Sequence, residues 1–142
     1  MLNIDIDSFI PHRKKIKIIG DILDVQEKTA VSSACVDSDW PLCDGSAVDS
    51  LVLIEAIAQT AAVIEGYKRS QRGKSGAKGW LVGVKNAEFY VDKVPLNTNL
   101  IISIESKHAF DNYGVIEGTI KAGEKILAVA TLQAMLMNEE DK

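Results

Sequence analysis

The stretch of residues 51–64 constrains the fold more than any other part of this sequence. Only three of its residues are polar, namely Glu55, Gln59 and Thr60. A helix with so few polar residues is apolar on nearly all sides, so other parts of the chain must cover it. It is also shorter than the roughly 20 apolar residues that span a bilayer, and we expect no membrane contact.

Residue types that favour helix ends flank this stretch. Asp49 and Ser50 are common N-cap residues and stand directly before the apolar run. Gly66 and the basic Lys68 and Arg69 suit a C-terminal end, because glycine terminates helices and cations favour the negative end of the dipole. We therefore predict one helix from about Asp49 or Ser50 to about Lys68.

Strand-like segments make up most of the remaining chain. Residues 15–25 and 29–36 are rich in β-branched and aliphatic side chains around a polar break, which predicts an antiparallel hairpin. After the helix, turn-forming sequences separate four more strand-like runs, over residues 80–91, 99–110, 113–122 and 125–137. Residues 37–49 and 94–97 show no sustained period and are predicted to be loops.

The order of these elements predicts an α+β fold. In the run 99–110, Leu100, Ile102 and Ile104 alternate with polar residues, as a strand that covers a core on one face requires. A curved antiparallel sheet wrapped around one long central helix, the hotdog fold, is the simplest way to bury that helix. Because no repeat or long linker divides the chain, we expect a single hotdog domain over residues 1–142.

Charge and cysteine content limit the function classes. The net charge of −4 argues against non-specific nucleic-acid binding, which needs a basic surface. Cys35 and Cys43 form no metal-ligand pattern, and the first residues do not resemble a signal peptide. We therefore expect a cytoplasmic protein with free thiols.

Three segments carry a resemblance to a known family. They are Ile10-Pro11-His12-Arg13, the helix segment from Leu53 to Ala61, and the segment from Leu81 to Phe89. In this order they resemble the FabZ-type β-hydroxyacyl-acyl-carrier-protein dehydratases of fatty-acid synthesis and related hotdog proteins of polyene pathways. The resemblance extends over residues 9–137.

The resemblance implies a thioester site between two subunits. In that family a histidine in the loop before the helix removes the α-proton, and a carboxylate on the helix of the other subunit assists. Glu55 matches that carboxylate. We expect unpaired backbone N–H groups near the helix start to polarise the thioester carbonyl. The residues expected to contact the substrate are Trp40, Ser50, Leu51, Gln59 and Gly83.

The loop before the helix departs from the family pattern. Asp39-Trp40-Pro41-Leu42 takes the place of the histidine segment, with Trp40 or Pro41 opposite the histidine. Loss of a positioned general base lowers a rate by about 10²–10⁴-fold. Asp49-Ser50 also replaces the family's Pro-Gly at the helix start. The only histidines, His12 and His108, are interpreted as structural or exposed.

Three functions agree with these residues. The first is a dehydratase-like enzyme in which Asp37 or Asp39 performs part of the proton transfer. The second is an acyl thioesterase in which Glu55 or Asp49 activates water or attacks the acyl carbon. The third is a non-catalytic protein that binds acyl chains or pairs with an active hotdog subunit.

The expected substrate is an acyl thioester of acyl carrier protein or of coenzyme A. Acyl carrier protein is acidic and would meet a cluster of five basic residues, which are Lys68, Arg69, Arg72, Lys74 and Lys78. We expect a homodimer or a trimer of dimers, in fatty-acid or polyketide metabolism. No metal or redox cofactor is implied.

Overall fold

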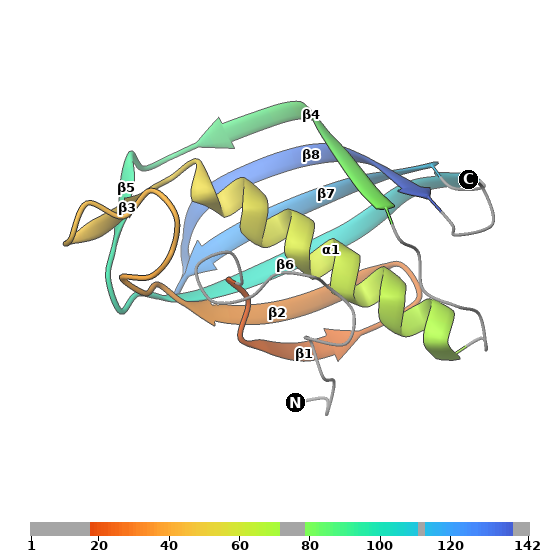
Figure 1. The fold of residues 1–142 in the computed structure, drawn as a ribbon, viewed down its shortest axis with the longest axis horizontal. Coiled ribbons are helices and arrows are strands. Elements are labelled where there is room, and N and C mark those ends of the chain that lie inside the picture. The colour runs from red at the N-terminus through yellow and green to blue at the C-terminus, as the bar shows by residue number, and fades with distance from the viewer. Residues whose placement is uncertain (1–17, 72–78, 111–112, 138–142) are drawn as a thin grey trace.

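The computed structural model describes residues 18–71, 79–110 and 113–137 (Figure 1). One long helix stands among antiparallel strands. In chain order the elements are β1 (Asp21–Val25), β2 (Thr29–Cys35), β3 (Ala47–Asp49), α1 (Val52–Gln71), β4 (Gly79–Phe89), β5 (Lys93–Pro95), β6 (Asn99–Phe110), β7 (Tyr113–Ala122) and β8 (Lys125–Met137).

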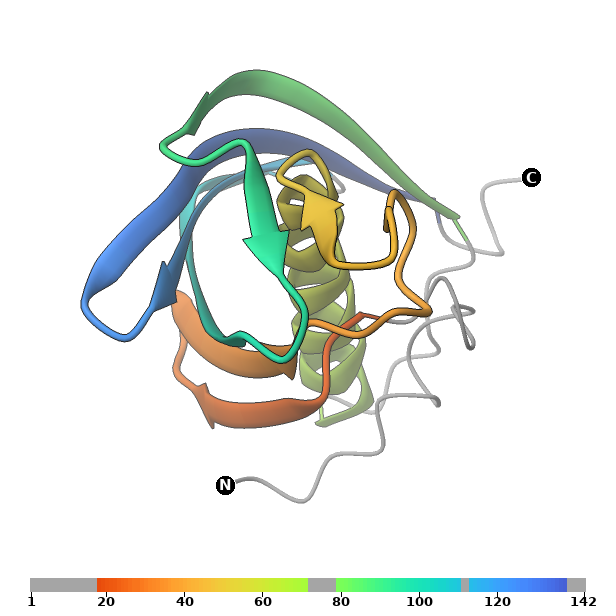
Figure 2. The ribbon, with the colours of Figure 1, turned by 90° about the vertical axis from the view of Figure 1, so that its left-hand side faces the viewer.

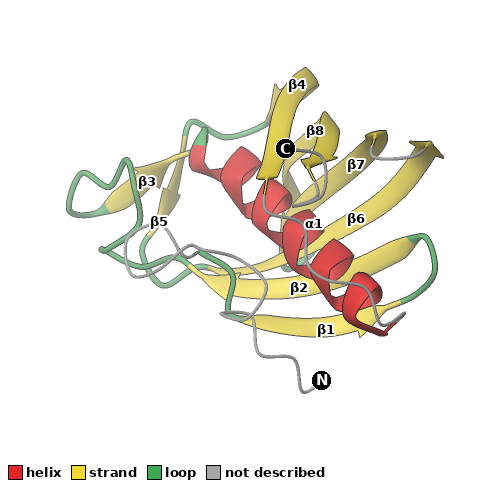
Figure 3. Ribbon diagram, turned by 45° about the vertical axis from the view of Figure 1, so that its right-hand side comes forward, coloured by secondary structure: helices red, strands yellow, loops and turns green. Residues whose placement is uncertain are grey.

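The large sheet has six strands in the order β1-β2-β6-β7-β8-β4, and every neighbouring pair is antiparallel. Helix α1 crosses its concave face, as Figures 1 and 3 show from two sides. The strands curve around the helix in the hotdog arrangement, which confirms the predicted α+β class and hotdog fold. Among the described residues, no helix is long and apolar enough to cross a membrane.

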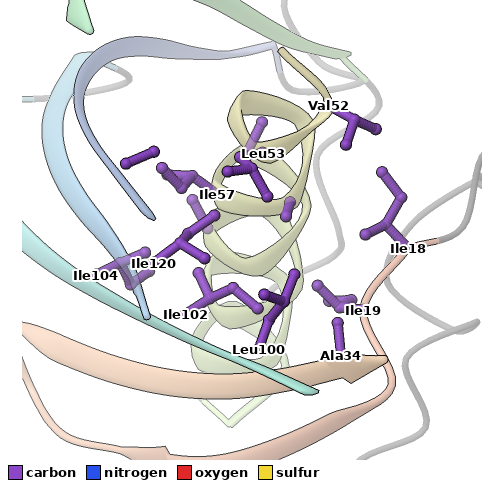
Figure 4. Close-up of a cluster of buried hydrophobic side chains, with 14 of the residues drawn as sticks. Ile18, Ile19, Ala34, Val52, Leu53, Ile57, Leu100, Ile102, Ile104 and Ile120 are labelled. Atoms are coloured by element: carbon purple, nitrogen blue, oxygen red, sulfur yellow. The ribbon is translucent and has the colours of Figure 1, made fainter. Parts of the chain in front are cut away.

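The core lies between the helix and the sheet. Leu53 and Ile57 of α1 point toward the isoleucines of β6 and β7 (Figure 4). The predicted inward face of β6 is confirmed, because Leu100, Ile102 and Ile104 are all buried. The apolar helix is therefore covered by the sheet that the sequence pattern predicted.

A pair of buried hydroxyls fixes the position of α1 on β2. The Oγ of Ser32 lies 2.8 Å from Oγ1 of Thr60, and Thr60 donates its own proton to the carbonyl of Ala56 at 2.8 Å. A hydroxyl has one proton, so Ser32 must be the donor to Thr60. Both side chains are fully buried with their hydrogen bonds made.

Two predicted boundaries need correction. Within the described residues the first strand begins at Asp21, and the N–H of Ile18 donates to Oε1 of Gln59 at 2.8 Å and not to the strand ladder. Residues 15–17 of the predicted strand lie outside the described residues. The helix continues to Gln71 and passes through Gly66, where we expected its last turn. One helical glycine costs only about 1 kcal/mol, which the packing of a buried helix outweighs.

A short second sheet replaces part of the two predicted loops. β3 pairs with β5 in antiparallel register, with Val48 opposite Val94, and both valines are buried. We predicted loops over residues 37–49 and 94–97, so this pairing is a correction. Strands of three residues are too short to show a period of two in the sequence.

Substitution of Gly118 by alanine is expected to destabilise the fold. Gly118 lies in the middle of the sheet, and a Cβ atom there would lie 2.5 Å from Cγ2 of the fully buried Ile57. Overpacking of this kind costs about 1–3 kcal/mol, which urea denaturation would measure as a lower free energy of unfolding. Gly83→Ala is the control, because its Cβ would meet only Oε1 of Gln133 at 3.9 Å. Equal stability of the two variants would contradict the close helix–sheet contact.

Candidate functional site

The start of α1 is enclosed by segments from two distant parts of the chain. Figure 2 shows β3, β5 and the loop before β3 in front of the helix end. The N–H of Ser50 donates to the carbonyl of Asp92 at 2.9 Å, and the N–H of Asp49 donates to the carbonyl of Leu42 at 3.1 Å. These bonds fix the turn that leads into the helix against the segment between β4 and β5.

The backbone donors that we expected to be unpaired at the helix start have partners within the chain. Besides the Ser50 bond to Asp92, the N–H of Leu51 donates to Oδ1 of Asp49 at 2.9 Å. Asp49 therefore acts as the capping residue, as its position suggested. The expectation that Ser50 and Leu51 offer free N–H groups to a thioester carbonyl is wrong for the chain as it stands.

Ionic contacts hold the loop beside this helix start. Lys93 of β5 forms a salt bridge with Asp44, and Oδ1 of Asp44 also accepts hydrogen bonds from Ser46 and Ala47. The Lys93 contact, followed by those bonds, holds the pKa of Asp44 well below its usual range. Asp44, and more weakly Asp49, raise the pKa of Lys93. The loop before the helix is thus anchored through Asp44.

Glu55 and Gln59 form the polar pair on the helix. Glu55 is half-buried in the first turn, and Nε2 of Gln59 donates to its Oε1 at 3.1 Å. Gln59 is only 1% exposed, and its Oε1 accepts the N–H of Ile18. Their spacing of four residues brings the two side chains together on one side of the helix, and Glu55 does not stand in open solvent.

The loop residues Trp40 and Asp39 lie in different environments. Trp40 is 6% exposed and belongs to the buried core, and its backbone N–H donates to the carbonyl of Asp37 at 3.1 Å. Asp39 is exposed, and its N–H donates to Oδ1 of Asp37 at 2.8 Å. Trp40 anchors the loop, and Asp39 is carried at the surface beside it.

The other two candidate substrate contacts lie at the surface of the chain. Leu51 is 56% exposed at the start of the helix, and Gly83 is exposed on β4. β4 is an edge strand of the large sheet, because β8 is its only neighbour among the described strands. Both residues are therefore placed where a second molecule would reach them.

The histidines and the basic cluster fall largely outside the described residues. His12, Arg72, Lys74 and Lys78 lie outside, as do the side chains of Lys68, Arg69 and His108. The backbone of His108 is nine residues along β6 from Asn99, or about 30 Å. Asn99, at the other end of β6, lies near the start of the helix. The segment just before it is bonded to the loop that leads into the helix, because the N–H of Leu96 donates to the carbonyl of Ser46 at 3.1 Å. Thus the His108 backbone stands at the opposite end of the sheet.

Over residues 18–71, 79–110 and 113–137, no group of three or more His, Cys, Asp or Glu side chains could hold a metal ion. The described chemistry at the helix start is that of carboxylates, one amide and backbone groups. Such groups can exchange protons and hold a polar ligand.

Comparison with known proteins identifies the class and then the family. A curved antiparallel sheet wrapped around one long helix defines the class of hotdog proteins. The profile of the ApeP-like family, described as ApeP dehydratase, matches residues 4–142. The chain belongs to this family.

Curated relatives agree with this assignment. The 3-hydroxyacyl-[acyl-carrier-protein] dehydratase FabZ of Cereibacter sphaeroides is 30% identical over 137 residues, covering 92% of this chain and 87% of the relative. FabZ of Xylella fastidiosa is 27% identical over 136 residues, covering 91% and 84%. The resemblance inferred from the three sequence segments is confirmed.

Solved structures show the same fold. A chain of the dehydratase heterocomplex ApeI:P from Xenorhabdus doucetiae matches with a TM-score of 0.85 and 20% identity, covering 96% of this chain and 93% of that one. A hypothetical thioesterase from Streptococcus pneumoniae, solved with coenzyme A, matches with a TM-score of 0.58 and 16% identity, covering 83% and 85%. At these identities the likeness concerns the fold alone.

Proposed function

We propose that this protein dehydrates 3-hydroxyacyl thioesters carried by acyl carrier protein, with Glu55 as the catalytic carboxylate. The observation that carries the proposal is a half-buried glutamate, held by Gln59 near the start of a buried helix. Glu55 is one of only three polar residues in the stretch 51–64, and by resemblance it matches the helix carboxylate of the dehydratases. The curated relatives are named as dehydratases of such substrates.

The reaction assigns one proton transfer to Glu55. A general base removes the α-proton, the electrons of the C–H bond form the Cα=Cβ double bond, and the C–O bond at Cβ breaks. The hydroxyl leaves as water with the proton of the Glu55 carboxyl group. After the enoyl product leaves, the general base releases the α-proton to solvent and Glu55 takes one up, so the net change is the loss of one water. General acid catalysis of this kind contributes about 10²–10⁴-fold.

The general base is proposed to come from a second hotdog subunit. Neither Trp40 nor Pro41 can exchange a proton at neutral pH, and the loop that contains them offers carboxylates but no histidine. The similar chain from Xenorhabdus doucetiae comes from a dehydratase heterocomplex. The 11-residue strand β4 has only β8 beside it among the described strands, and its Val84 is 52% exposed, which supports an assembly in which a partner pairs along this strand.

A homodimer is the alternative assembly, alone or as a trimer of dimers. In it the exposed Asp39 of one subunit would serve as the base opposite Glu55 of the other. Trp40, Leu51 and Gly83 would then border the acyl chain where the two subunits meet. Light scattering of the purified protein, alone and mixed with a histidine-containing hotdog dehydratase, distinguishes the two assemblies.

A non-catalytic partner role is the second candidate function. It is favoured by the paired N–H groups of Ser50 and Leu51, which leave the thioester carbonyl without these two donors. A missing oxyanion donor costs about 10²–10³-fold in rate. In this case the chain would support the site of an active subunit.

The test is an assay of products with 3-hydroxyacyl and acyl thioesters of acyl carrier protein and of coenzyme A, read by mass spectrometry. The chain is assayed alone and with a FabZ-type dehydratase that keeps its loop histidine and has its helix carboxylate replaced by the corresponding amide. Enoyl product formed by the chain alone or by this mixture supports the proposal. Free acid would instead indicate a thioesterase, and no turnover in any combination would indicate the non-catalytic role. A higher rate with the thioester of acyl carrier protein or with that of coenzyme A identifies the acyl carrier that the protein uses.

A further inference from the structure

We infer that Gln59 is a positioning residue that presents Glu55 to the substrate, an inference that rests on the proposed function. Gln59 is 1% exposed, so in the chain as described it does not offer its amide to a substrate. Its amide instead joins two parts of the protein, the N–H of Ile18 and the carboxylate of Glu55. The role inferred for Gln59 is therefore indirect, whereas the sequence predicted a substrate contact.

The orientation of the Gln59 amide is determined by Ile18. A backbone N–H can only donate, so the atom of Gln59 that lies 2.8 Å from it must be the carbonyl oxygen Oε1. A flipped amide would place two donors against each other. The amide nitrogen Nε2 therefore always points along the helix toward Glu55, 3.1 Å from its Oε1.

This fixed donor distinguishes the two oxygens of Glu55. Oε1 accepts the hydrogen bond from Gln59, which holds that oxygen in one place on the helix. A carboxyl group held in this way is oriented before the substrate arrives, which reduces the cost of aligning the reacting groups.

The same amide couples the site to the chain entering β1. Ile18 and Ile19 are buried, and Ile18 lies beside Val52 of the helix (Figure 4). Because Ile18 donates to Gln59 and not to a neighbouring strand, this entry segment sets the orientation of the amide. The backbone before β1 thus acts on Glu55 through one side chain.

Three variants test this role. Gln59→Met removes both hydrogen bonds. Gln59→Glu keeps an acceptor for Ile18 and, once its carboxyl group is ionised, has no proton to donate to Glu55, so its kinetics are measured across a range of pH. We expect kcat to fall about 10–100-fold in both variants, with KM changed less than about threefold, since misplacement of a reacting group acts mainly on the chemical step. Hydrogen exchange at the Ile18 amide should accelerate only in Gln59→Met. In the double variant Glu55→Gln/Gln59→Glu, the amide at position 55 can donate to the carboxylate at position 59, which also accepts the N–H of Ile18. Both hydrogen bonds are then restored, so its Tm should exceed that of either single variant while turnover stays low.

The outcomes separate this inference from the proposed function. Wild-type kcat in Gln59→Glu, in a protein that loses activity in Glu55→Gln, would overturn the positioning role alone. Unchanged activity in Glu55→Gln would refute the proposed function, and the Tm of the double variant would still report on the pair. A double variant less stable than both single variants would show that the two side chains are not coupled as described.

Discussion

Glu55→Gln is expected to lower turnover of 3-hydroxyacyl thioesters by about 10²–10⁴-fold. The amide cannot donate a carboxylic proton, so the hydroxyl at Cβ loses its acid. The fold should be retained, because the new side-chain carbonyl can still accept the hydrogen bond from Gln59. Steady-state kinetics of the assembled protein, together with circular dichroism, measures both effects.

A matched control separates charge removal from loss of the acid. Glu65 lies on the same helix and is also half-buried, and it stands almost three turns further along α1. Glu65→Gln removes the same charge and should leave turnover within about twofold, as expected for a substitution outside the site. Similar losses in both variants would indicate a general effect on the helix, and full activity in Glu55→Gln would remove Glu55 from the mechanism.

Trp40→Ala is expected to lower the free energy of unfolding by about 3–5 kcal/mol. Trp40 is 6% exposed within the core, and it is the largest side chain that the loop before β3 contributes there. Its removal leaves a cavity in the core. Urea denaturation followed by far-ultraviolet circular dichroism measures the loss without depending on tryptophan fluorescence.

Trp40→Phe distinguishes a structural role from a substrate contact. Phenylalanine retains most of the apolar surface, so its cost in stability should be clearly smaller than that of alanine. If the indole only anchors the loop, the variant that loses more free energy of unfolding should also show the larger rise in KM for the acyl thioester. A higher KM in a fully stable Trp40→Phe protein would show instead that the ring meets the acyl chain.

The main fold could be predicted because its signals are local and repeated. The apolar helix needs a cover, and the alternation of Leu100, Ile102 and Ile104 identifies the strand face that provides it. The β3–β5 sheet could not be predicted in this way. Its pairing of Val48 with Val94 depends on contact between segments more than 40 residues apart, and each strand is only three residues long.

The candidate site was predictable to a similar extent. Glu55 and Gln59 stand four residues apart, a spacing that brings side chains together on any helix. The hydrogen bonds of Ser50 to Asp92 and of Gln59 to Ile18 join distant segments, and no local pattern reports them. For that reason the sequence suggested free donors at the helix start, and the three-dimensional contacts correct this view.

The cap formed by Asp49 has a consequence for any ligand that approaches this end of the protein. The Leu51 N–H already holds a tethered anion, so an incoming carbonyl oxygen must compete with a group whose local concentration is set by only two residues of chain. A neutral oxygen is the weaker competitor, because hydrogen bonds to charged acceptors are roughly twice as strong. An uncharged carbonyl oxygen would therefore reach the Leu51 N–H only where its other contacts outweigh the loss of the Asp49 hydrogen bond.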